Sequence, residues 1–450
     1  MDPYAEIAAI SAGLVVLACC ACLLPGVIRV LLIGQSAYWA MSYIARPLVL
    51  LTTRPEPRFG DNVADPRLAA MGYDRGIAAA LQPVAYGILV YAGLVAALTV
   101  WARKRRWAAS DSRMAGQPEL MATLGVIYLI GSLGRIASIL TGTVARAGEV
   151  QTASPALSLI TLLASIGSLG LIVLIRPARS WQTVAVIAGL TVGELLWTVA
   201  IESKTPIMGA ALAIAIRFAM TGWNRTKTIA VVTIAVVAIG AFGALQSLKE
   251  TPELKAQAAS ANSAYPPSVQ PFLGLLRRFD LLEAATDACF AGPGSWLSPG
   301  QVLSHGVASL LPAQVLGSSK MQAGTAWAEQ IRGGSVDMSE VSVSLAEGNI
   351  NEGYVLGGAA GVTVEVIFTF VILLLWAAAL SGRRIVPIVL GLALSENPVV
   401  FERGILGTFE VIGKYLQAVV LIWIIHLAVV EFQHRRAVLV APPVPAAVAK

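Results

Sequence analysis

Residues 355–381, VLGGAAGVTVEVIFTFVILLLWAAALS, contain a single charged side chain, that of Glu365. An apolar run of about 20 residues is long enough to cross the hydrocarbon core of a bilayer as an α-helix. Glycines at the start of this run permit close packing of helices at the membrane. The stretch therefore predicts a membrane-spanning helix, and similar apolar runs make up most of the chain outside residues 248–354.

The composition of the whole chain agrees with this interpretation. Charged residues make up 13% and hydrophobic residues 56% of the 450 residues, whereas about 25% of a soluble domain is charged. The short alternating segments of a membrane β-barrel are absent. We therefore expect an all-α polytopic integral membrane protein with about 11 transmembrane helices. The predicted spans are 7–24, 28–51, 76–101, 118–139, 154–176, 181–199, 206–222, 228–247, 355–381, 385–400 and 412–431.

These spans divide the chain into four parts. Residues 1–247 are expected to form an N-terminal membrane bundle of about eight spans, and residues 355–431 a C-terminal bundle of about three. Between them, residues 248–354 form one large extracytoplasmic loop of short helices. Residues 432–450, with three prolines near the end, are expected to be a disordered cytoplasmic tail.

Basic residues predict the orientation of the spans. If the spans alternate, five basic clusters fall on one side of the membrane: Arg103–Arg106, Arg176 with Arg179, Arg225 with Lys227, Arg383 with Arg384, and Arg435 with Arg436. Short cytoplasmic loops are enriched in Lys and Arg. The N-terminus and the large loop are therefore expected outside a bacterial cytoplasmic (inner) membrane, and the C-terminus inside the cell.

Ionisable residues collect near the predicted outer ends of the spans. They are Arg135, Glu194, Glu202, Lys204, Glu365, Glu402, Arg403, Glu410 and Lys414. Charges at membrane depth are costly and usually face a cavity or a partner. They predict a polar cavity that opens outward, and the alternative is a set of interhelical ion pairs and snorkelling side chains. The many cations of the outer loops would suit an anionic lipid-linked phosphate or pyrophosphate, because Arg binds phosphate through a bidentate fork.

The large loop carries further candidate residues. Residues 268–290 predict one amphipathic helix, with Arg278 beside its apolar stripe and Arg277 on the opposite side. Ser298-Pro299 predicts the start of a second helix that carries His305. His305 has the chemistry of a general base, although a lone histidine is more often structural than catalytic. Glu352 lies where the loop returns to the membrane, and helix capping is the alternative for it. The loop lacks a zinc-ligand pattern, so no metal is expected.

Three stretches, in this order and at these places, carry a family resemblance. Ile201-Glu202-Ser203-Lys204-Thr205-Pro206 opens a short span, and Arg277-Arg278-Phe279-Asp280 lies in the large outer loop. Asn351-Glu352-Gly353-Tyr354 precedes a Gly-rich span. Together with the arrangement of spans, they make the chain resemble the O-antigen polymerase family, whose members polymerise oligosaccharide repeat units on polyprenyl carriers.

The resemblance implies an inverting, metal-independent glycosyltransferase without a cofactor. The implied pyrophosphate ligands are Lys204, Arg278, Arg277, Arg403 and, at the outer end of its span, Arg135. His305 or Glu352 would be the base that activates the acceptor hydroxyl. The implied partners are a polyprenyl-pyrophosphate-linked oligosaccharide, the lipid bilayer, and a flippase or chain-length regulator of the same pathway. No nucleic-acid partner is expected.

Three other functions stay open from the sequence. A glycan ligase would use the same carrier, and a transferase could use a polyprenyl monophosphate sugar instead. A multi-span polysaccharide or lipid transporter is the non-enzymatic alternative. It would need a cavity that also opens inward, and the internal repeats common among transporters are not visible in this chain.

Overall fold

The structure is a computed structural model, and it describes residues 2–58, 63–105, 116–144, 155–176, 180–201, 203, 205–222, 224–229, 231, 233, 259–277, 279–312, 320–333 and 345–440. No strand occurs within these ranges. Seven of the described helices are long and apolar enough to cross a membrane. They are α1 (Pro3–Leu23), α5 (Tyr73–Lys104), α6 (Pro118–Leu140), α7 (Pro155–Leu174), α8 (Ser180–Ala200), α17 (Asn349–Leu380) and α19 (Ile405–Val440). This confirms the predicted class of all-α, membrane-embedded protein.

The other predicted spans correspond to shorter or interrupted helices. The predicted second span is α2 (Val27–Ala40), the π-helical turn η1 (Met41–Ala45) and α3 (Arg46–Thr53), which follow one another without a gap. The wide turn precedes Pro47, which has no N–H to donate to the preceding turn. The predicted seventh and tenth spans are the shorter helices α9 (Thr205–Met220) and α18 (Ile385–Glu396). Most of the predicted eighth span, 228–247, lies outside the described residues. The count of eleven spans and the orientation stay predictions.

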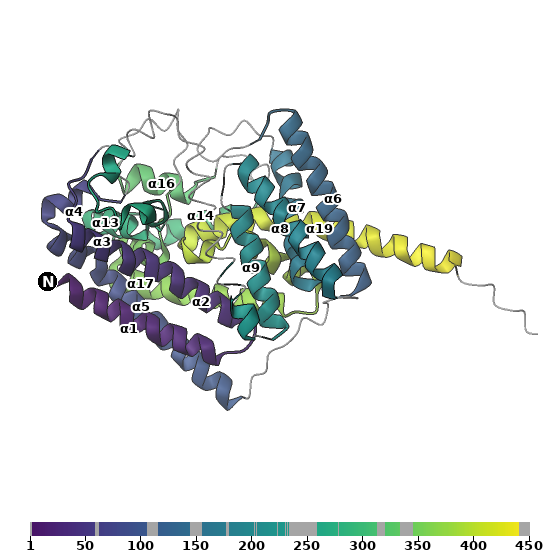
Figure 1. The fold of residues 1–450 in the computed structure, drawn as a ribbon, viewed down its shortest axis with the longest axis horizontal. Coiled ribbons are helices and arrows are strands. Elements are labelled where there is room, and N and C mark those ends of the chain that lie inside the picture. Colours follow the sequence, from purple (N-terminus) through teal and green to yellow (C-terminus); the bar gives the residue numbers. More distant parts are fainter. Residues whose placement is uncertain are drawn as a thin grey trace, which may run out of the picture.

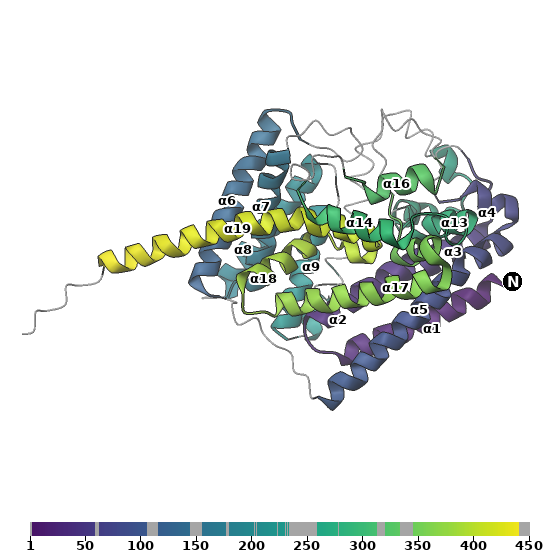
Figure 2. The same cartoon turned by 180° about the vertical axis from the view of Figure 1, so that it is seen from behind.

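The long helices form two groups that share α18 and α19. In the first group α5 packs against α1 and α17, and α2 packs against α1 and α17 (Figure 1). In the second group α7 lies between α6 and α9, and α8 packs against α7 and α9. The helices α18 and α19 contact members of both groups (Figure 2). Buried aromatic residues such as Trp39, Tyr91 and Trp376 fill the interior.

The helix α17 contains a sharp corner. Gly358 has a φ of +59° and a ψ of −140°, a conformation that side chains with a Cβ avoid. Beyond the corner the chain runs back beside its first turns. Two contacts between the arms show this: Asn349 donates a 2.9 Å hydrogen bond to Thr369, and the backbones of Gly353 and Gly361 touch. The predicted span 355–381 is therefore the longer arm of a helical hairpin that begins at Asn349.

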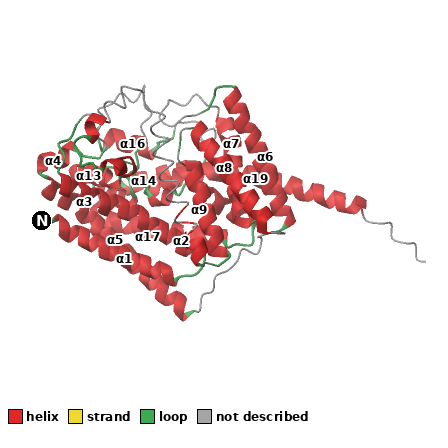
Figure 3. Cartoon of the chain, viewed as in Figure 1, coloured by secondary structure: helices red, strands yellow, loops and turns green. Residues whose placement is uncertain are grey.

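The large loop between α9 and α17 contains short helices (Figure 3). Those described include η2 (Gln270–Phe272), α12 (Leu273–Leu276), α13 (Leu281–Ala291), α14 (Pro299–Leu310) and α16 (Ala323–Gln330). The prediction of one helix over 268–290 is wrong, because the chain leaves helical structure between α12 and α13. Leu281, Leu282 and Asp287 are all buried. Tertiary contacts of α13 with α5 and α17 therefore set its direction independently of α12.

The start of α14 and the end of α19 both follow from residues nearby in the sequence. The predicted start at Ser298-Pro299 is confirmed, since Ser298 and Gln301 form a capping box at the start of α14. At the other end of the chain, α19 continues to Val440, beyond the predicted end of the membrane bundle at 431. Its last turns contain no Pro or Gly, and Arg435 pairs with Glu431 at 2.7 Å. Helix propensity therefore extends the last span into the segment that was expected to be disordered.

Candidate functional site

A cavity of about 470 Å³ opens between the ends of α6, α7, α8 and α19. This volume falls in the range of small-molecule binding sites. Its lining mixes apolar side chains with hydroxyl, amide and charged groups. The apolar lining residues are Val144, Leu157, Leu159, Leu162, Trp197 and Ile201, and the polar ones are Ser138, Thr143, Ser158, Thr161, Ser165, Glu396, Lys414 and Gln417. Such a cavity suits an amphiphilic ligand with a polar, hydroxyl-rich head.

Lys414 and Glu396 are the charged residues of this wall. Lys414 is exposed toward the cavity, and no carboxylate of the described residues lies within 4.0 Å of its ammonium group. Glu396, the last residue of α18, accepts a 2.6 Å hydrogen bond from the Tyr415 hydroxyl. The cavity thus offers an ammonium group to an anion and a carboxylate, held in place by Tyr415, to a hydroxyl group.

A buried ion pair supports the wall of the cavity. Arg135 donates to both carboxylate oxygens of Glu194 at 3.0 Å, and it also donates to the Ser165 hydroxyl at 2.7 Å. Its guanidinium group lies 4.9 Å from the ring centre of Trp197. Ser165 and Trp197 both line the cavity. Because Glu194 already neutralises Arg135, the geometry favours a positioning role for Arg135 over direct binding of pyrophosphate.

A cluster of buried glutamates surrounds the start of α19, about two turns before Lys414. The N–H of Ile405 donates to both oxygens of Glu365, at 3.2 and 3.1 Å, and the N–H of Leu406 donates to Glu352 at 3.1 Å. These are N–H groups that the first turn of a helix leaves unpaired, and the helix dipole favours anions there. Gly404 leaves room for the carboxyl group of Glu352, with which a side chain at residue 404 would collide.

The cluster contains more acid than base. Glu347, Glu352 and Glu365 are almost completely buried, and the cation beside them is Arg403, which donates a 3.4 Å hydrogen bond to Glu347. Burial raises the pKa of Glu347, and the charge of Arg403 only partly opposes this effect. One carboxyl oxygen of Glu347 and one of Glu352 have no hydrogen-bond partner. Glu347 lies before the start of α17, and its unpaired oxygen leaves burial as the larger influence on its carboxyl group.

The structure brings some of the predicted site residues together and separates others. Glu352 and Arg403 both belong to the glutamate cluster. His305 is half-buried on α14, whose Gly306 packs against Phe409 of α19. Arg277 lies in the large loop between α9 and α17 and donates a 2.7 Å hydrogen bond to Asn262. Lys204 and Arg278 lie outside the described residues, so their predicted roles stay predictions.

Sequence reasoning overlooked Glu396 and Tyr415. Glu396 is followed by Asn397-Pro398 at the end of an apolar run, which marks the end of a helix at the membrane surface. An ionisable residue at the end of an apolar run also drew attention to Arg135 and Lys414, so the same pattern could have identified Glu396. Nothing local in the sequence, however, relates Glu396 to Tyr415.

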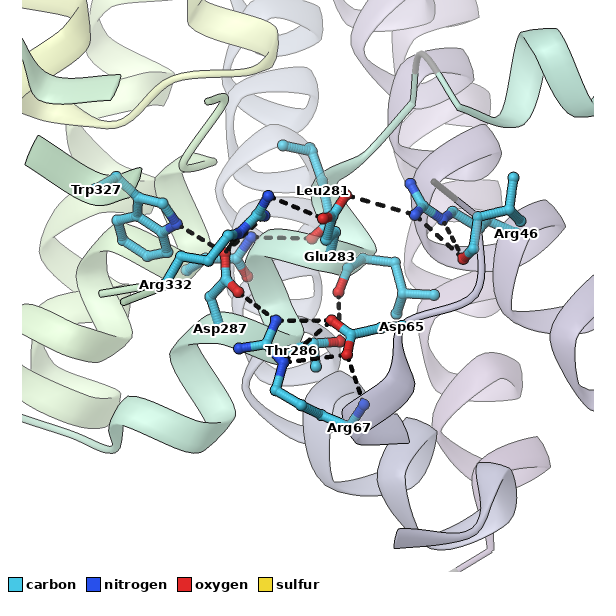
Figure 4. A network of polar contacts seen from close by, with 12 residues as sticks. Arg46, Asp65, Arg67, Leu281, Glu283, Thr286, Asp287, Trp327 and Arg332 are labelled. Atoms are coloured by element: carbon cyan, nitrogen blue, oxygen red, sulfur yellow. Dashed lines mark hydrogen bonds and ion pairs between the residues drawn. The ribbon is translucent and has the colours of Figure 1, made fainter. Parts of the chain in front are cut away.

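A separate ionic network fastens the large loop to the membrane helices (Figure 4). Asp287 of α13 is fully buried and accepts hydrogen bonds from Arg67, Trp327 and Arg332. Arg332 also pairs with Glu283 at 2.8 Å, and Glu283 lies 3.7 Å from Arg46. Although burial lowers the pKa of Arg67, hydrogen bonds to Asp65 and Asp287 raise it overall. These opposite charges satisfy one another, so the network is structural.

The long apolar helices with buried polar groups between them define a polytopic helical membrane protein. No family model matches the sequence, and no curated protein or solved structure is detectably similar to it. Within the described residues, no group of three or more His, Cys, Asp and Glu side chains is arranged to hold a metal ion.

Proposed function

We propose that the protein is a membrane glycosyltransferase that polymerises oligosaccharide repeat units carried on polyprenyl pyrophosphate at the outer face of the cytoplasmic membrane. The observation that carries the proposal is the cavity that Lys414 and Glu396 share. Its apolar side chains suit the polyprenyl chain, its hydroxyl groups suit a saccharide, and Lys414 suits a phosphate. The family resemblance of the sequence supports the same substrate class.

The proposed reaction assigns a role to each charged group of the cavity. Lys414 binds the pyrophosphate of the donor and stabilises the negative charge that develops as it leaves. A hydroxyl group of the acceptor glycan attacks the anomeric carbon, so that a new C–O bond forms as the bond to the pyrophosphate breaks. Glu396 accepts the proton of that hydroxyl group, with Tyr415 keeping its carboxylate in position. The polyprenyl pyrophosphate is released, and no redox partner is needed.

The residues predicted from the sequence complete this proposal. Lys204 and Arg278 are proposed as further pyrophosphate ligands, with Arg277 and Arg403 as additional cations. Thr205, the neighbour of Lys204, lines a smaller cavity of about 50 Å³ together with Tyr38 and Glu402. His305 and Glu352 remain alternative bases to Glu396. Of these three, Glu396 is the one that lines the large cavity.

The experiment that tests the proposal starts from a strain that lacks the gene. Its surface polysaccharide and its lipid-linked intermediates are profiled together, with and without a plasmid copy. Loss of long polymer, with single repeat units retained on an outward-facing carrier, is the expected result. Long polymer that stays on its carrier identifies a ligase instead. An unchanged profile overturns the proposal.

Point variants then test the roles of the residues. Lys414→Met removes the ammonium group, and Glu396→Gln removes the base while keeping an acceptor for Tyr415. We expect polymer formation to fall at least about tenfold in the first variant and about a hundredfold in the second, the lower end of general-base effects. Lys104→Met, at the exposed end of α5, is the matched control and should polymerise normally. Wild-type activity of both cavity variants at normal protein levels overturns the site assignment.

A proton-coupled transporter is the second candidate function. The observation that favours it is the hairpin of α17, which holds Glu352 and Glu365 at a break inside an apolar helix. Broken helices and buried acids often mark transport pathways. Accumulation of the lipid-linked glycan on the inner leaflet of the deletion strain would support transport, whereas the polymerase predicts accumulation on the outer leaflet.

A further inference from the structure

The helix α14 has an apolar face that is not covered by any part of the chain that the structure describes. Leu303, Val307 and Leu311 follow one another at intervals of four residues, and they are 69%, 54% and 43% exposed. Residues four apart in a helix lie on one face. The three side chains therefore form a continuous stripe along the helix and just past its end.

The composition of α14 distinguishes it from a helix that faces water. Residues 299–310 contain no Asp, Glu, Lys or Arg, and His305 is their one titratable side chain. A solvated surface helix normally carries charged residues on its exposed face. Here the exposed residues are uncharged, namely Pro299, Gly300, Gln301, Leu303, Ser304 and Val307, and water is a poor environment for the Leu and Val side chains.

Contacts place α14 at the start of a candidate membrane span. Gly306 packs against Phe409, and the Ser309 carbonyl oxygen approaches Gly413 so closely that a side chain at residue 413 would collide with it. The helix thus crosses the first turns of α19. It lies on the same face of the molecule as α17 and α19 (Figure 2), and both of these helices expose apolar side chains of their own, such as Val371 and Val420.

From these observations we infer that α14 is an interfacial helix whose Leu303, Val307 and Leu311 insert into the lipid bilayer beside α19. The bilayer is the occupant that fits, because the stripe is uncharged and its helix packs on a candidate membrane span that itself exposes apolar side chains. An interfacial helix lies in the plane of the membrane surface with its apolar face at the boundary of the headgroup and acyl regions. This inference is independent of the proposed function.

Spin labelling of the protein in lipid nanodiscs tests the inference. Single cysteines replace Leu303 and Val307 in a background in which Cys19, Cys20, Cys22 and Cys289 are changed to Ser. Val420→Cys on α19 is the lipid reference, and Glu329→Cys on the exposed side of α16 is the water reference. We expect labels at residues 303 and 307 to be relaxed more by oxygen than by a water-soluble nickel chelate, as at residue 420.

Two results would overturn the inference. Labels at 303 and 307 that respond like the one at residue 329 place the stripe in water. Labels that neither reagent reaches place it against protein, such as a second copy of this chain.

A measurement on the wild-type chain tests the same inference without substitutions, so its result does not depend on whether the cysteine variants fold. Nanodiscs that contain a phospholipid with a photoactivatable acyl chain are irradiated, and the modified peptides are identified by mass spectrometry. Modification within residues 299–311 at a level similar to that of α19 supports insertion. Modification of α19 without α14 contradicts it.

Discussion

Gly353 and Gly361 of α17 touch backbone to backbone across the corner at Gly358, because the chain folds back on itself there. A Cβ at residue 361 would collide with the Gly353 carbonyl oxygen. This contact sets the distance between the two arms of the hairpin, and the arms carry Glu352 and Glu365 to the start of α19.

Substitution at the contact should therefore loosen the hairpin. We expect Gly361→Ala to lower the free energy of unfolding by about 1–3 kcal/mol, the usual effect of overpacking. The thermal unfolding midpoint in detergent measures the change. Gly93→Ala on α5 is the matched control, since its added methyl group meets nothing within 4 Å. Equal midpoints for the two variants would contradict the observed contact.

The glutamate cluster predicts a dependence of stability on pH. Since the pKa of Glu347 is raised by burial, with Arg403 opposing, the folded protein holds this proton more tightly than the unfolded chain does. The stabilising contribution is present at low pH and is lost as the pH rises above about 4.5, the ordinary value for a glutamate. Glu347→Gln should therefore weaken the fall of the unfolding midpoint with rising pH.

The exposed Glu56 provides the control for this measurement. Unfolding midpoints of wild type, Glu347→Gln and Glu56→Gln are compared between about pH 4 and about pH 8. This range begins near the ordinary pKa of a glutamate and extends upward, where a raised pKa acts. Glu56→Gln should follow the wild type. A Glu347→Gln profile parallel to the wild type would show that Glu347 does not titrate differently in the folded protein.

The network around Asp287 should be essential for the placement of the large loop. Asp287→Ala removes the fully buried carboxylate that Arg67 and Arg332 share and leaves them only Asp65 and Glu283. Loss of one member of a buried ion pair costs about 3–5 kcal/mol. We expect faster proteolysis within the loop, measured as the appearance of fragments in proteoliposomes. Arg54→Gln is the control, because the exposed pair of Arg54 with Asp74 contributes about 0–1 kcal/mol. Similar cleavage rates in both variants would show that the network around Asp287 does not hold the large loop in place.

Variants of the Arg135–Glu194 ion pair distinguish two roles of Arg135, positioning of the cavity wall and direct binding of the ligand. Arg135→Gln should lower both stability and polymer formation, since Glu194 is left buried without its partner. In the positioning role, the double variant Arg135→Gln with Glu194→Gln should regain much of both. If Arg135 instead binds pyrophosphate, the double variant should regain stability but not polymer. Unfolding and polymer profiles of the same three variants decide between the two roles.

Hydropathy predicted most of the helices, and their ends agree within a few residues, as for the predicted span 118–139 and α6 (Pro118–Leu140). The corner in α17 was not predictable in this way, because Gly357 and Gly358 lie within an uninterrupted apolar run. It depends on the contact of Gly353 with Gly361, and on the bond from Ile405 to Glu365, forty residues away in the sequence.

The candidate site was predicted less well, because the described residues that the sequence assigned to catalysis or pyrophosphate binding do not line the large cavity. Charge at membrane depth pointed to Arg135, Glu365 and Lys414, because a charge in an apolar run is visible in the sequence itself. Which charges satisfy one another was not visible. Arg135 bonds Glu194, and the Lys414 side chain faces the cavity, yet both are single cations near the end of an apolar segment. Pairing depends on which helices are neighbours, and the sequence pattern does not determine this.

The hydrogen bonds from α19 to the hairpin of α17 also bear on how the protein is made. The ribosome completes Glu352 and Glu365 before it reaches Ile405 and Leu406, whose N–H groups hold these two carboxylates in the finished protein. For that interval the growing chain must keep two acids in an apolar hairpin without their final donors. The first turn of α19 is therefore a late closing step of biogenesis, and a chain released before residue 405 would lack the means to complete the hairpin.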